Sequence, residues 1–497
     1  MKRNNIIYLF NILMLCLVFQ TSFAQKKVKK EISGEELANI QGHGGAYADN
    51  DPRSLIKDEK VLNNLDEWQT LKFGFMVHWG IYSQWGSIES WVLDNDPSRN
   101  RDWGRPKLKA WEEANKDIDV FRKNYWNLNK TFNPIKFNPE KWAELADKAG
   151  MKYFVFTTMH HDGFNMFDSK YSNYKITSKE VPYHTNKNAD VTKSLFNSFR
   201  EKGFKIGAYY SKPSWKHKDY WIKENKIVNR NANYDVSKNP KRWKKFTKFT
   251  QNNINQLMSD YGKIDILWLD GGWVNAKNRN QGVNMDKIAK HGRKKQPGLI
   301  VVDRTIHGAN ENYITPEQRI PEEPIFYPWE TCMTMGKMWS YNDNDTFKPT
   351  SQVINMLVDV VAKGGNFLLN LGASPEGWFH PTAVKQMEEI GEWMKINGTA
   401  IHYTKPVAPF RAGKFGYTQN KNGDVNAIYL LEKHEKLPQL LEITDFNDTK
   451  NVKSVELLGF GEISTFNIIN GKLQLRIPME AMQTIYKSQA CVFRIKK

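Results

Sequence analysis

Cysteine is scarce in this chain, and that scarcity excludes two kinds of architecture. The 497 residues contain three cysteines, too few for a disulfide framework to hold the fold. Neither Cys332 nor Cys491 has a neighbour at metal-ligand spacing, which argues against a zinc site. We also find no internal repeat and no low-complexity tract. The fold must therefore depend on an ordinary hydrophobic core.

Long apolar runs are also missing. The run over residues 6–19 is shorter than the roughly 20 residues that a membrane-spanning helix needs, and no later run is longer. Lys2 and Arg3 precede it and Ser22-Phe23-Ala24 follows it, which is the pattern of a secretory signal peptide. We therefore expect residues 1–24 to be a signal peptide, a mature chain that begins near Gln25, a secreted or periplasmic location and no membrane span.

Acidic residues are outnumbered. The sequence has 72 Lys and Arg against 54 Asp and Glu, a formal charge of +18, of which Lys2 and Arg3 account for two. The basic residues form short clusters at 26–30, 241–248 and 293–295 rather than gathering on one helix with base-reading aromatics, and export makes nucleic acid an improbable partner. A positive surface would attract a polyanion such as a sulfated or uronic polysaccharide. Lysines that serve only solubility are an equally good interpretation.

The length and the aromatic content indicate a two-domain globular protein. A chain of 497 residues is too long for one ordinary core. Aromatic residues make up 13% of it, with 17 tryptophans, and indole rings stack well on sugar faces. Most single tryptophans are nevertheless core residues, so this count alone identifies no site.

Short apolar runs alternate with amphipathic stretches of helical period over residues 65–402, as in repeated strand and helix units. We therefore predict an α/β fold, a (β/α)8-like TIM barrel whose eighth strand is degenerate. The predicted strands are 73–78, 153–159, 205–210, 264–269, 299–303, a short one before Glu330, and 366–371. The predicted helices include 139–149, 191–202, 243–261 and 381–397.

Two flanking segments differ from the barrel. Residues 403–497 contain alternating runs at 425–431, 440–443, 452–458 and 473–477, separated by turn signals, which predicts a C-terminal antiparallel β-sandwich. Residues 25–64 are polar and rich in Gly, Asp and Asn, and we expect a mobile N-terminal arm.

Polar and ionisable residues gather where the predicted strands end. In a parallel barrel these carboxyl ends meet on one face and carry the active site. A single histidine at such a place is more often structural, but five coincident ends favour a site. The residues concerned are His78-Trp79, His160-His161-Asp162, Trp268 with Asp270, Asp303-Arg304, and Trp329-Glu330.

Two carboxyl groups suggest glycoside hydrolysis. Asp270 follows an apolar strand and precedes two glycines, which leave room for a ligand near the backbone; helix capping is the alternative use of such an aspartate. A retaining glycosidase needs a second, protonated carboxyl about 5 to 5.5 Å away. Glu330 is the first candidate because its apolar neighbours would raise its pKa. Glu322 and Glu323 remain rivals.

The paired His160 and His161 allow a metal interpretation, but adjacent residues of a strand point to opposite sides. The i, i+4 pair of a zinc protease is different. We therefore expect them to donate hydrogen bonds to sugar hydroxyls, with no metal and no cofactor.

The sequence resembles the α-L-fucosidases of glycoside hydrolase family 29 over roughly residues 65–400. Its most specific blocks are His-His-Asp-Gly-Phe and Trp-x-Asp-Gly-Gly. The blocks that carry the resemblance are Lys72 to Gly80, Tyr153 to Tyr171, Asp265 to Gly272, Trp329-Glu330 with Trp339-Ser340-Tyr341, and Gly364 to Asn370.

The resemblance implies a metal-free, retaining mechanism through a glycosyl-enzyme ester. Asp270 takes the place of the family's nucleophile and Glu330 that of its acid/base. Many members have Glu-Trp in the loop after the first strand, whereas this chain has Glu89-Ser90-Trp91. The implied substrate-binding residues are His78, Glu89, Trp91, His160, His161, Tyr209, Trp268, Arg304 and Trp339.

The sugar and the class of function leave alternatives. The expected activity is removal of terminal α-L-fucosyl groups from oligo- or polysaccharides, with anionic polymers among the candidate substrates. An exo-α-L-galactosidase acting on algal galactan, sulfated or not, is the alternative enzyme, because an apolar pocket discriminates weakly against one added hydroxyl. An inactive sugar-binding barrel is the alternative outside catalysis. Linkage preference and oligomeric state do not follow from the sequence.

Overall fold

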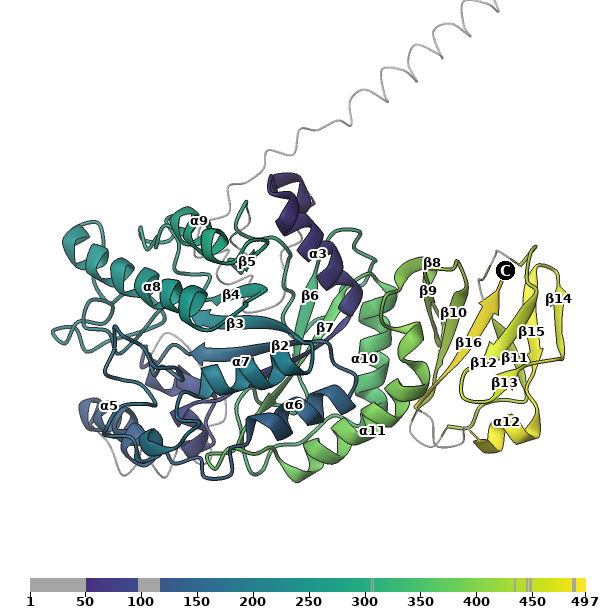
Figure 1. The fold of residues 1–497 in the computed structure, drawn as a ribbon, viewed down its shortest axis with the longest axis horizontal. Coiled ribbons are helices and arrows are strands. Elements are labelled where there is room, and N and C mark those ends of the chain that lie inside the picture. Colours follow the sequence, from purple (N-terminus) through teal and green to yellow (C-terminus); the bar gives the residue numbers. More distant parts are fainter. Residues whose placement is uncertain are drawn as a thin grey trace, which may run out of the picture. The chain divides into compact units, whose positions relative to one another are not determined.

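A parallel β-sheet with helices on its outer face carries the larger part of the protein (Figure 1). The computed structural model describes residues 51–96, 117–304, 306, 308–432, 435–443, 446, 449–484 and 489–497. The predicted signal peptide and residues 25–50 of the predicted arm lie outside the described residues. None of the helices in the described part of the chain has the length and apolarity that a membrane crossing requires.

The sheet has seven strands in the order β5-β4-β3-β2-β1-β7-β6, so that β1 lies inside it and β5 and β6 are its edges. All neighbouring strands are parallel and almost every strand residue is buried, which explains why their sequences read as continuous apolar runs. The strands are β1 Phe73–His78, β2 Tyr153–Met159, β3 Lys205–Ser211, β4 Ile266–Asp270, β5 Ile300–Val302, β6 Glu330–Thr334 and β7 Asn366–Gly372.

The helices begin with local signals that the sequence supplies. Asn138 caps α6 with Pro139 at its first turn, and Asp190 caps α7. Helix α3 begins before the predicted start of the barrel at residue 65, and its Val61 and Leu65 are buried. The helices are α3 Glu59–Leu71, α5 Ile118–Trp126, α6 Pro139–Lys148, α7 Val191–Glu201, α8 Pro240–Asp260, α9 Met285–Lys295, α10 Thr350–Ala362 and α11 Pro381–Asn397, with 3-10 turns at Pro52–Leu55, Ile81–Trp85, Glu89–Leu93, Asn127–Lys130, Pro182–Thr185 and Gly398–Ala400.

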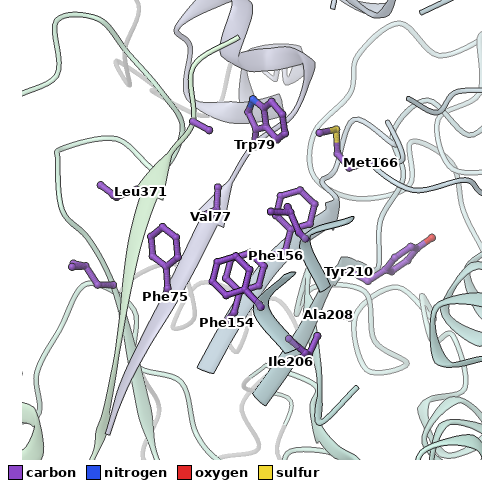
Figure 2. Close-up of a cluster of buried hydrophobic side chains, with 14 of the residues drawn as sticks. Phe75, Val77, Trp79, Phe154, Phe156, Met166, Ile206, Ala208, Tyr210 and Leu371 are labelled. Carbon is purple, nitrogen blue, oxygen red and sulfur yellow. The ribbon is translucent and has the colours of Figure 1, made fainter. Parts of the chain in front are cut away.

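The two faces of the sheet build two different cores. Alternate residues such as Phe75, Phe154 and Ile206 point outward into the larger core against the helices (Figure 2). The intervening residues, among them Tyr153 and Trp268, fill the barrel interior. This alternation follows from the two-residue period of a strand, and it determines which side chains can reach the site.

An irregular segment fills the gap between β5 and β6. Isolated bridges join Val302 to Glu311, Ile314 to Trp329 and Glu317 to Cys332. The backbone of this segment also bonds to its neighbours, as in Glu330 N to Ile314 O at 2.9 Å. Residues 311–318 therefore take the place of a regular eighth strand, for which the sequence analysis predicted no position.

The C-terminal part is a sandwich of two antiparallel sheets with the orders β13-β12-β16-β10-β9-β8 and β11-β15-β14. Side chains from both sheets share one apolar core, which includes Cys491. Cys332 is a free cysteine in the barrel interior. The elements are β8 Lys405–Ala412, β9 Phe415–Gln419, β10 Val425–Leu430, β11 Leu440–Ile443, β12 Ser454–Leu457, β13 Gly461–Glu462, β14 Phe466–Ile469, β15 Lys472–Arg476, α12 Met479–Thr484 and β16 Ala490–Lys496.

Candidate active site

Asp270 is the last residue of β4, at the carboxyl end of the sheet. Gly271 follows it at a φ of +83°, and a Cβ there would lie 2.3 Å from Pro213, so only glycine fits this turn. The amide of Gly271 donates to Asp270 Oδ1 at 2.7 Å. The turn thus fixes the orientation of the carboxylate. Gly271 serves this turn, so Asp270 is not used as a helix cap.

Three side chains keep Asp270 ionised. Arg304 Nη1 donates to Oδ1 at 3.0 Å, Tyr209 Oη donates to Oδ2 at 2.6 Å, and His161 Nε2 lies 3.7 Å from Oδ2. Burial works against the charged form, but Arg304, His161 and Tyr209 outweigh it, so the pKa of this carboxyl lies below its usual range. An anionic, oriented carboxylate is suited to nucleophilic attack.

Three histidines surround this carboxylate, and each ring is fixed through Nδ1. His160 bonds Ser90 Oγ at 2.6 Å and His161 bonds Ser211 Oγ at 2.5 Å. Their rings lie 4.1 Å apart beyond the end of β2, so both face one site although they are adjacent in the chain. Burial lowers the pKa of His160 well below its usual range, and the neighbouring His161 adds to this effect.

His78, at the end of β1, has a defined tautomer. Its Nδ1 lies 2.7 Å from Asn370 Oδ1, and the amide of Asn370 is oriented by its bond to the Trp339 carbonyl oxygen at 2.7 Å. His78 must therefore donate from Nδ1, which leaves Nε2 as an acceptor. Burial lowers the pKa of His78 to about 4, so it is neutral at pH 7 and can accept a hydrogen bond from a sugar hydroxyl.

Aromatic rings form the walls around the histidines. Trp91 lies 5.0 Å from the His161 ring, and Trp215 and Trp273 lie 5.1 Å from it. Trp339 lies 5.1 Å from His78. Flat apolar walls beside fixed polar groups are typical of sugar sites, because the ring faces stack while the polar groups select hydroxyls.

Glu89 is a buried acid in the loop after β1. Ser340 N donates to its Oε1 at 2.9 Å. Its backbone has a φ of +28°, a strained conformation for a residue other than glycine. Burial raises the pKa of Glu89 to about 8 against the hydrogen bonds from Ser340, and the charge of Asp270 adds to the rise. Glu89 is therefore a neutral acid near pH 7 and can donate a hydrogen bond.

Glu330 does not lie where the sequence suggested. It begins β6 instead of following a strand, and it is 0% exposed within the barrel interior. Its carboxylate accepts hydrogen bonds from Tyr153 at 2.8 Å, Trp268 at 3.0 Å and Tyr313 at 3.3 Å. Burial raises its pKa to about 7 although these bonds oppose the rise. A carboxyl enclosed in this way cannot reach a glycosidic oxygen, which argues against Glu330 as the acid/base.

Glu322 and Glu323 lie at the opposite end of the strands. Both are exposed, and the residues around them bond to Lys363, as in Lys363 Nζ to Pro321 O at 2.8 Å and Ile325 N to Lys363 O at 3.2 Å. Lys363 precedes β7, so these contacts are at the amino ends of the strands, away from Asp270.

The irregular segment 311–318 between β5 and β6 instead brings Glu317 to the site. The sequence analysis missed this residue. Glu317 forms an ion pair with Arg304 Nη2, while Arg304 Nη1 bonds Asp270. The bridge to Cys332 and the bond from Gln318 N to Cys332 O at 3.0 Å hold its backbone. No hydrophobic period marks this irregular segment, so its only sequence signal is an acidic residue shortly after Arg304.

Other residues of the site were also missed. Ser90, Ser211 and Asn370 orient the three histidines, and Trp215 and Trp273 line the wall. Trp273 and Asn370 stand within or beside the blocks that carried the family resemblance, so that signal was present. Ser90 and Ser211 had no such sequence signal, because only the three-dimensional structure shows that their hydroxyls lie beside histidine rings.

His160, His161 and Asp270 present ligand atoms that all lie within 4.8 Å of one another, a spacing at which a metal ion could be held. Arg304 already bonds the same carboxylate, and a second cation there would be repelled. These residues therefore fit sugar recognition better than metal binding.

Comparisons with known proteins agree with this geometry. The family model described as alpha-L-fucosidase matches residues 49–399. The tissue alpha-L-fucosidase of Mus musculus is 28% identical over 397 residues, which cover 76% of this chain and 81% of the mouse protein.

Solved structures show the same fold. The alpha-L-fucosidase isoenzyme 1 from Paenibacillus thiaminolyticus has a TM-score of 0.69 at 25% identity and covers 88% of this chain and 99% of its own. A fucosidase from Bacteroides thetaiotaomicron, solved as a trapped covalent intermediate with 2-fluoro-fucosyl fluoride, has a TM-score of 0.69 at 22% identity and covers 91% and 98%. The chain belongs to the alpha-L-fucosidase family and is a glycoside hydrolase.

Proposed function

We propose that this protein removes terminal α-L-fucosyl groups with retention of configuration, with Asp270 as nucleophile and Glu317 as acid/base. The observation that carries the proposal is that one guanidinium, that of Arg304, bonds both carboxylates. Two carboxylates on one guanidinium are neighbours, as the pair of a retaining enzyme must be, whose carboxyls stand ~5 to 5.5 Å apart. The trapped intermediate of the Bacteroides thetaiotaomicron fucosidase supports the same two-step chemistry.

In the first step an oxygen of Asp270 attacks the anomeric carbon while the bond to the leaving oxygen breaks. Glu317 must be in its protonated form for this step; it gives its proton to that oxygen, so the aglycone leaves as a neutral alcohol and a fucosyl ester forms on Asp270. Arg304 and Tyr209 then remain beside the ester and favour return of the negative charge to Asp270.

In the second step water attacks the anomeric carbon from the side that the aglycone left. Glu317, now ionised, takes one proton from that water, and the ester bond breaks to release fucose and the Asp270 carboxylate. Both residues return to their starting states, so the cycle needs no cofactor.

Exposure favours Glu317 over Glu89 as the acid/base. The leaving oxygen carries the rest of the glycan, so its proton donor must lie at the open side of the site. The side chain of Glu317 is 21% exposed, whereas Glu89 is 1% exposed. Glu89 is better placed to donate a hydrogen bond to a hydroxyl of the bound sugar, together with His78 and the aromatic wall.

Labelling and leaving-group effects test the assignment. A 2-fluoro-fucosyl fluoride should attach to the peptide that contains Asp270, as detected by mass spectrometry. The variant Glu317→Gln should lose about 10²–10⁴-fold in kcat/KM on alkyl fucosides but far less on aryl fucosides with good leaving groups, which need no proton. Azide should restore turnover of this variant by taking the place of the attacking water and forming α-L-fucosyl azide. A label on another residue, or equal losses on both substrates, would refute the assignment.

We also propose that the protein is exported with loss of residues 1–24. The charged start, the short apolar run and Ser22-Phe23-Ala24 support this. Mass spectrometry of the protein recovered from the cell exterior or periplasm should give an N-terminus near Gln25, and a retained Met1 would contradict the proposal.

A further inference from the structure

Helices α8 and α9 lie side by side on the outside of the barrel (Figure 1). A groove of about 240 Å³ runs between them, lined by Gln251 and Asn255 of α8 and by Lys287, Lys290 and Lys294 of α9, together with Ile288 and His291. Gln251 Nε2 donates to Val283 O at 3.0 Å, which ties α8 to the start of α9. The groove is separate from the site around Asp270.

The α9 wall of the groove is cationic. Lys287, Lys290 and Lys294 recur at helical spacing and are all exposed, so their charges share one face over ~10 Å. Within the described ranges none of these three lysines forms an ion pair. The one acidic residue of α9, Asp286, accepts a hydrogen bond from Asn310 at 2.7 Å.

The α8 wall extends the same charge. Lys244 and Lys248 are exposed and precede Gln251 and Asn255 at intervals that place all four on one helix face. The acidic residue at the end of α8, Asp260, pairs with Lys170 at 2.7 Å. Positive charge therefore predominates along the groove, because its exposed lysines on the two helices outnumber Asp286, the one acidic residue of α9.

The groove also contains a neutral polar group without a partner. Asn255 Oδ1 is buried and accepts no hydrogen bond from any described residue. An oxygen with so little accessible surface belongs to the wall of the groove. The lining residues include no Phe, Tyr or Trp, and His291 is the one ring among them on which a nucleic-acid base could stack.

We propose that the α8–α9 groove binds a sulfated or uronic polysaccharide chain, whose anionic groups face the lysines of the groove. That the ligand is a glycan rests on the proposed function, since the active site acts on the end of a sugar chain. The groove would hold the polymer on the enzyme while the active site removes sugars from its ends. The substrates of the proposed function would then be anionic, fucose-containing polysaccharides.

Binding of dextran sulfate, measured by isothermal titration calorimetry over a range of salt concentrations, tests this proposal. The triple variant Lys287→Ala, Lys290→Ala, Lys294→Ala should bind about tenfold or more weakly at low salt, with a slope of log Kd against log salt smaller by about two to three. The matched control Lys179→Ala, Lys187→Ala, Lys193→Ala changes the net charge equally at exposed positions outside the groove and should bind within about twofold of wild type. Neutral dextran should not bind.

Equal losses in both triple variants would overturn the proposal, because they would show only diffuse attraction to the net charge. It would also be overturned if single-stranded DNA bound the groove as tightly as dextran sulfate does. Hydrolysis of 4-nitrophenyl α-L-fucoside should be unchanged in both triples. Absence of that hydrolysis in wild type would refute the proposed function. The binding data would still show whether the α8–α9 groove binds an anionic polysaccharide.

Discussion

The indole N–H of Trp268 lies 3.0 Å from the carboxylate of Glu330 and donates to it. Trp268 also stacks under Tyr209, with ring centroids 5.3 Å apart, and Tyr209 bonds Asp270. Glu330 thus holds Trp268, which packs against Tyr209, and Tyr209 bonds the proposed nucleophile Asp270. Glu330 itself does not contact Asp270 through these bonds.

Glu330→Gln should therefore keep most of the activity, within about tenfold of wild type, because a neutral amide preserves the shape and can still accept from Trp268. Loss of an acid/base would instead cost about 10²–10⁴-fold. Steady-state kinetics on alkyl and aryl fucosides, beside Glu317→Gln, separate the two roles. A loss in Glu330→Gln that spares aryl substrates and is rescued by azide would return the acid/base role to Glu330.

The same carboxyl should make stability depend on pH. The pKa of Glu330 in the folded state, about 7, lies above its value in the unfolded state, so the folded state binds the proton more tightly. The stability that this proton contributes is lost as pH rises from about 4.5 to 7. Wild type should lose about 3 kcal/mol more than Glu330→Gln over this interval. Urea unfolding at a series of pH values measures the free energy of unfolding of both proteins. If it depends on pH in the same way in both, the raised pKa of a buried Glu330 is contradicted.

Glu89 should set an alkaline limit on activity. Its pKa of about 8 keeps it protonated at neutral pH, and as pH rises through that value it loses the hydrogen bond that it donates. In Glu89→Gln, which is a permanent neutral donor, the fall of kcat/KM near pH 8 should disappear. The exposed Glu140→Gln serves as the control, and a limb that persists in Glu89→Gln would show that another group causes it.

Arg304 should control the acid limit. Its charge lowers the pKa of Asp270, so Arg304→Gln should raise that pKa and move the acid limb of kcat/KM to higher pH. Loss of the shared partner of both carboxylates should also lower kcat/KM by about 10²–10³-fold. Arg304→Lys keeps the charge and should retain the position of the limb while still losing rate, because an ammonium cannot bond two carboxylates in a fixed fork. A limb that does not move in Arg304→Gln would contradict the role assigned to the charge.

Lys212 and Asp303 form a buried ion pair of 2.5 Å at the ends of β3 and β5. Lys212→Met should destabilise the protein by about 3–5 kcal/mol, because it leaves a buried carboxylate without its partner. The double variant Lys212→Met, Asp303→Leu should recover much of that loss. Chemical denaturation measures both, and a double variant that is less stable than the single one would contradict this view of the pair.

The sequence predicted the strands of the sheet well because each central strand is buried on both faces and so appears as an apolar run. It misplaced Glu330 for the same reason. An acid within a buried strand contradicts the apolar pattern, and its presence is explained by hydrogen bonds from Tyr153, Trp268 and Tyr313, which lie elsewhere in the sequence. The expected strand was therefore set before Glu330 and the residue assigned to a strand end, where a carboxyl would face substrate.

The glycine pair and the apolar strand made Asp270 predictable, since both features are local. Glu317 was not predictable, because the segment around it has neither strand nor helix period and reaches the site only through Arg304. Local patterns thus identify groups fixed by regular structure, while groups placed by irregular segments depend on contacts that the sequence does not display.

The two carboxyls proposed as catalytic are held by backbone of unequal stability. Asp270 ends a strand that is paired on both sides, whereas Glu317 is carried by a segment that isolated bridges hold against its neighbour. Partial opening would displace the proton donor before the nucleophile. On gentle heating, hydrolysis of glycans with poor leaving groups should therefore fail at a lower temperature than covalent capture of a fluoro-sugar by Asp270. Between these two temperatures the enzyme should still form the glycosyl ester with the fluoro-sugar although it no longer hydrolyses glycans.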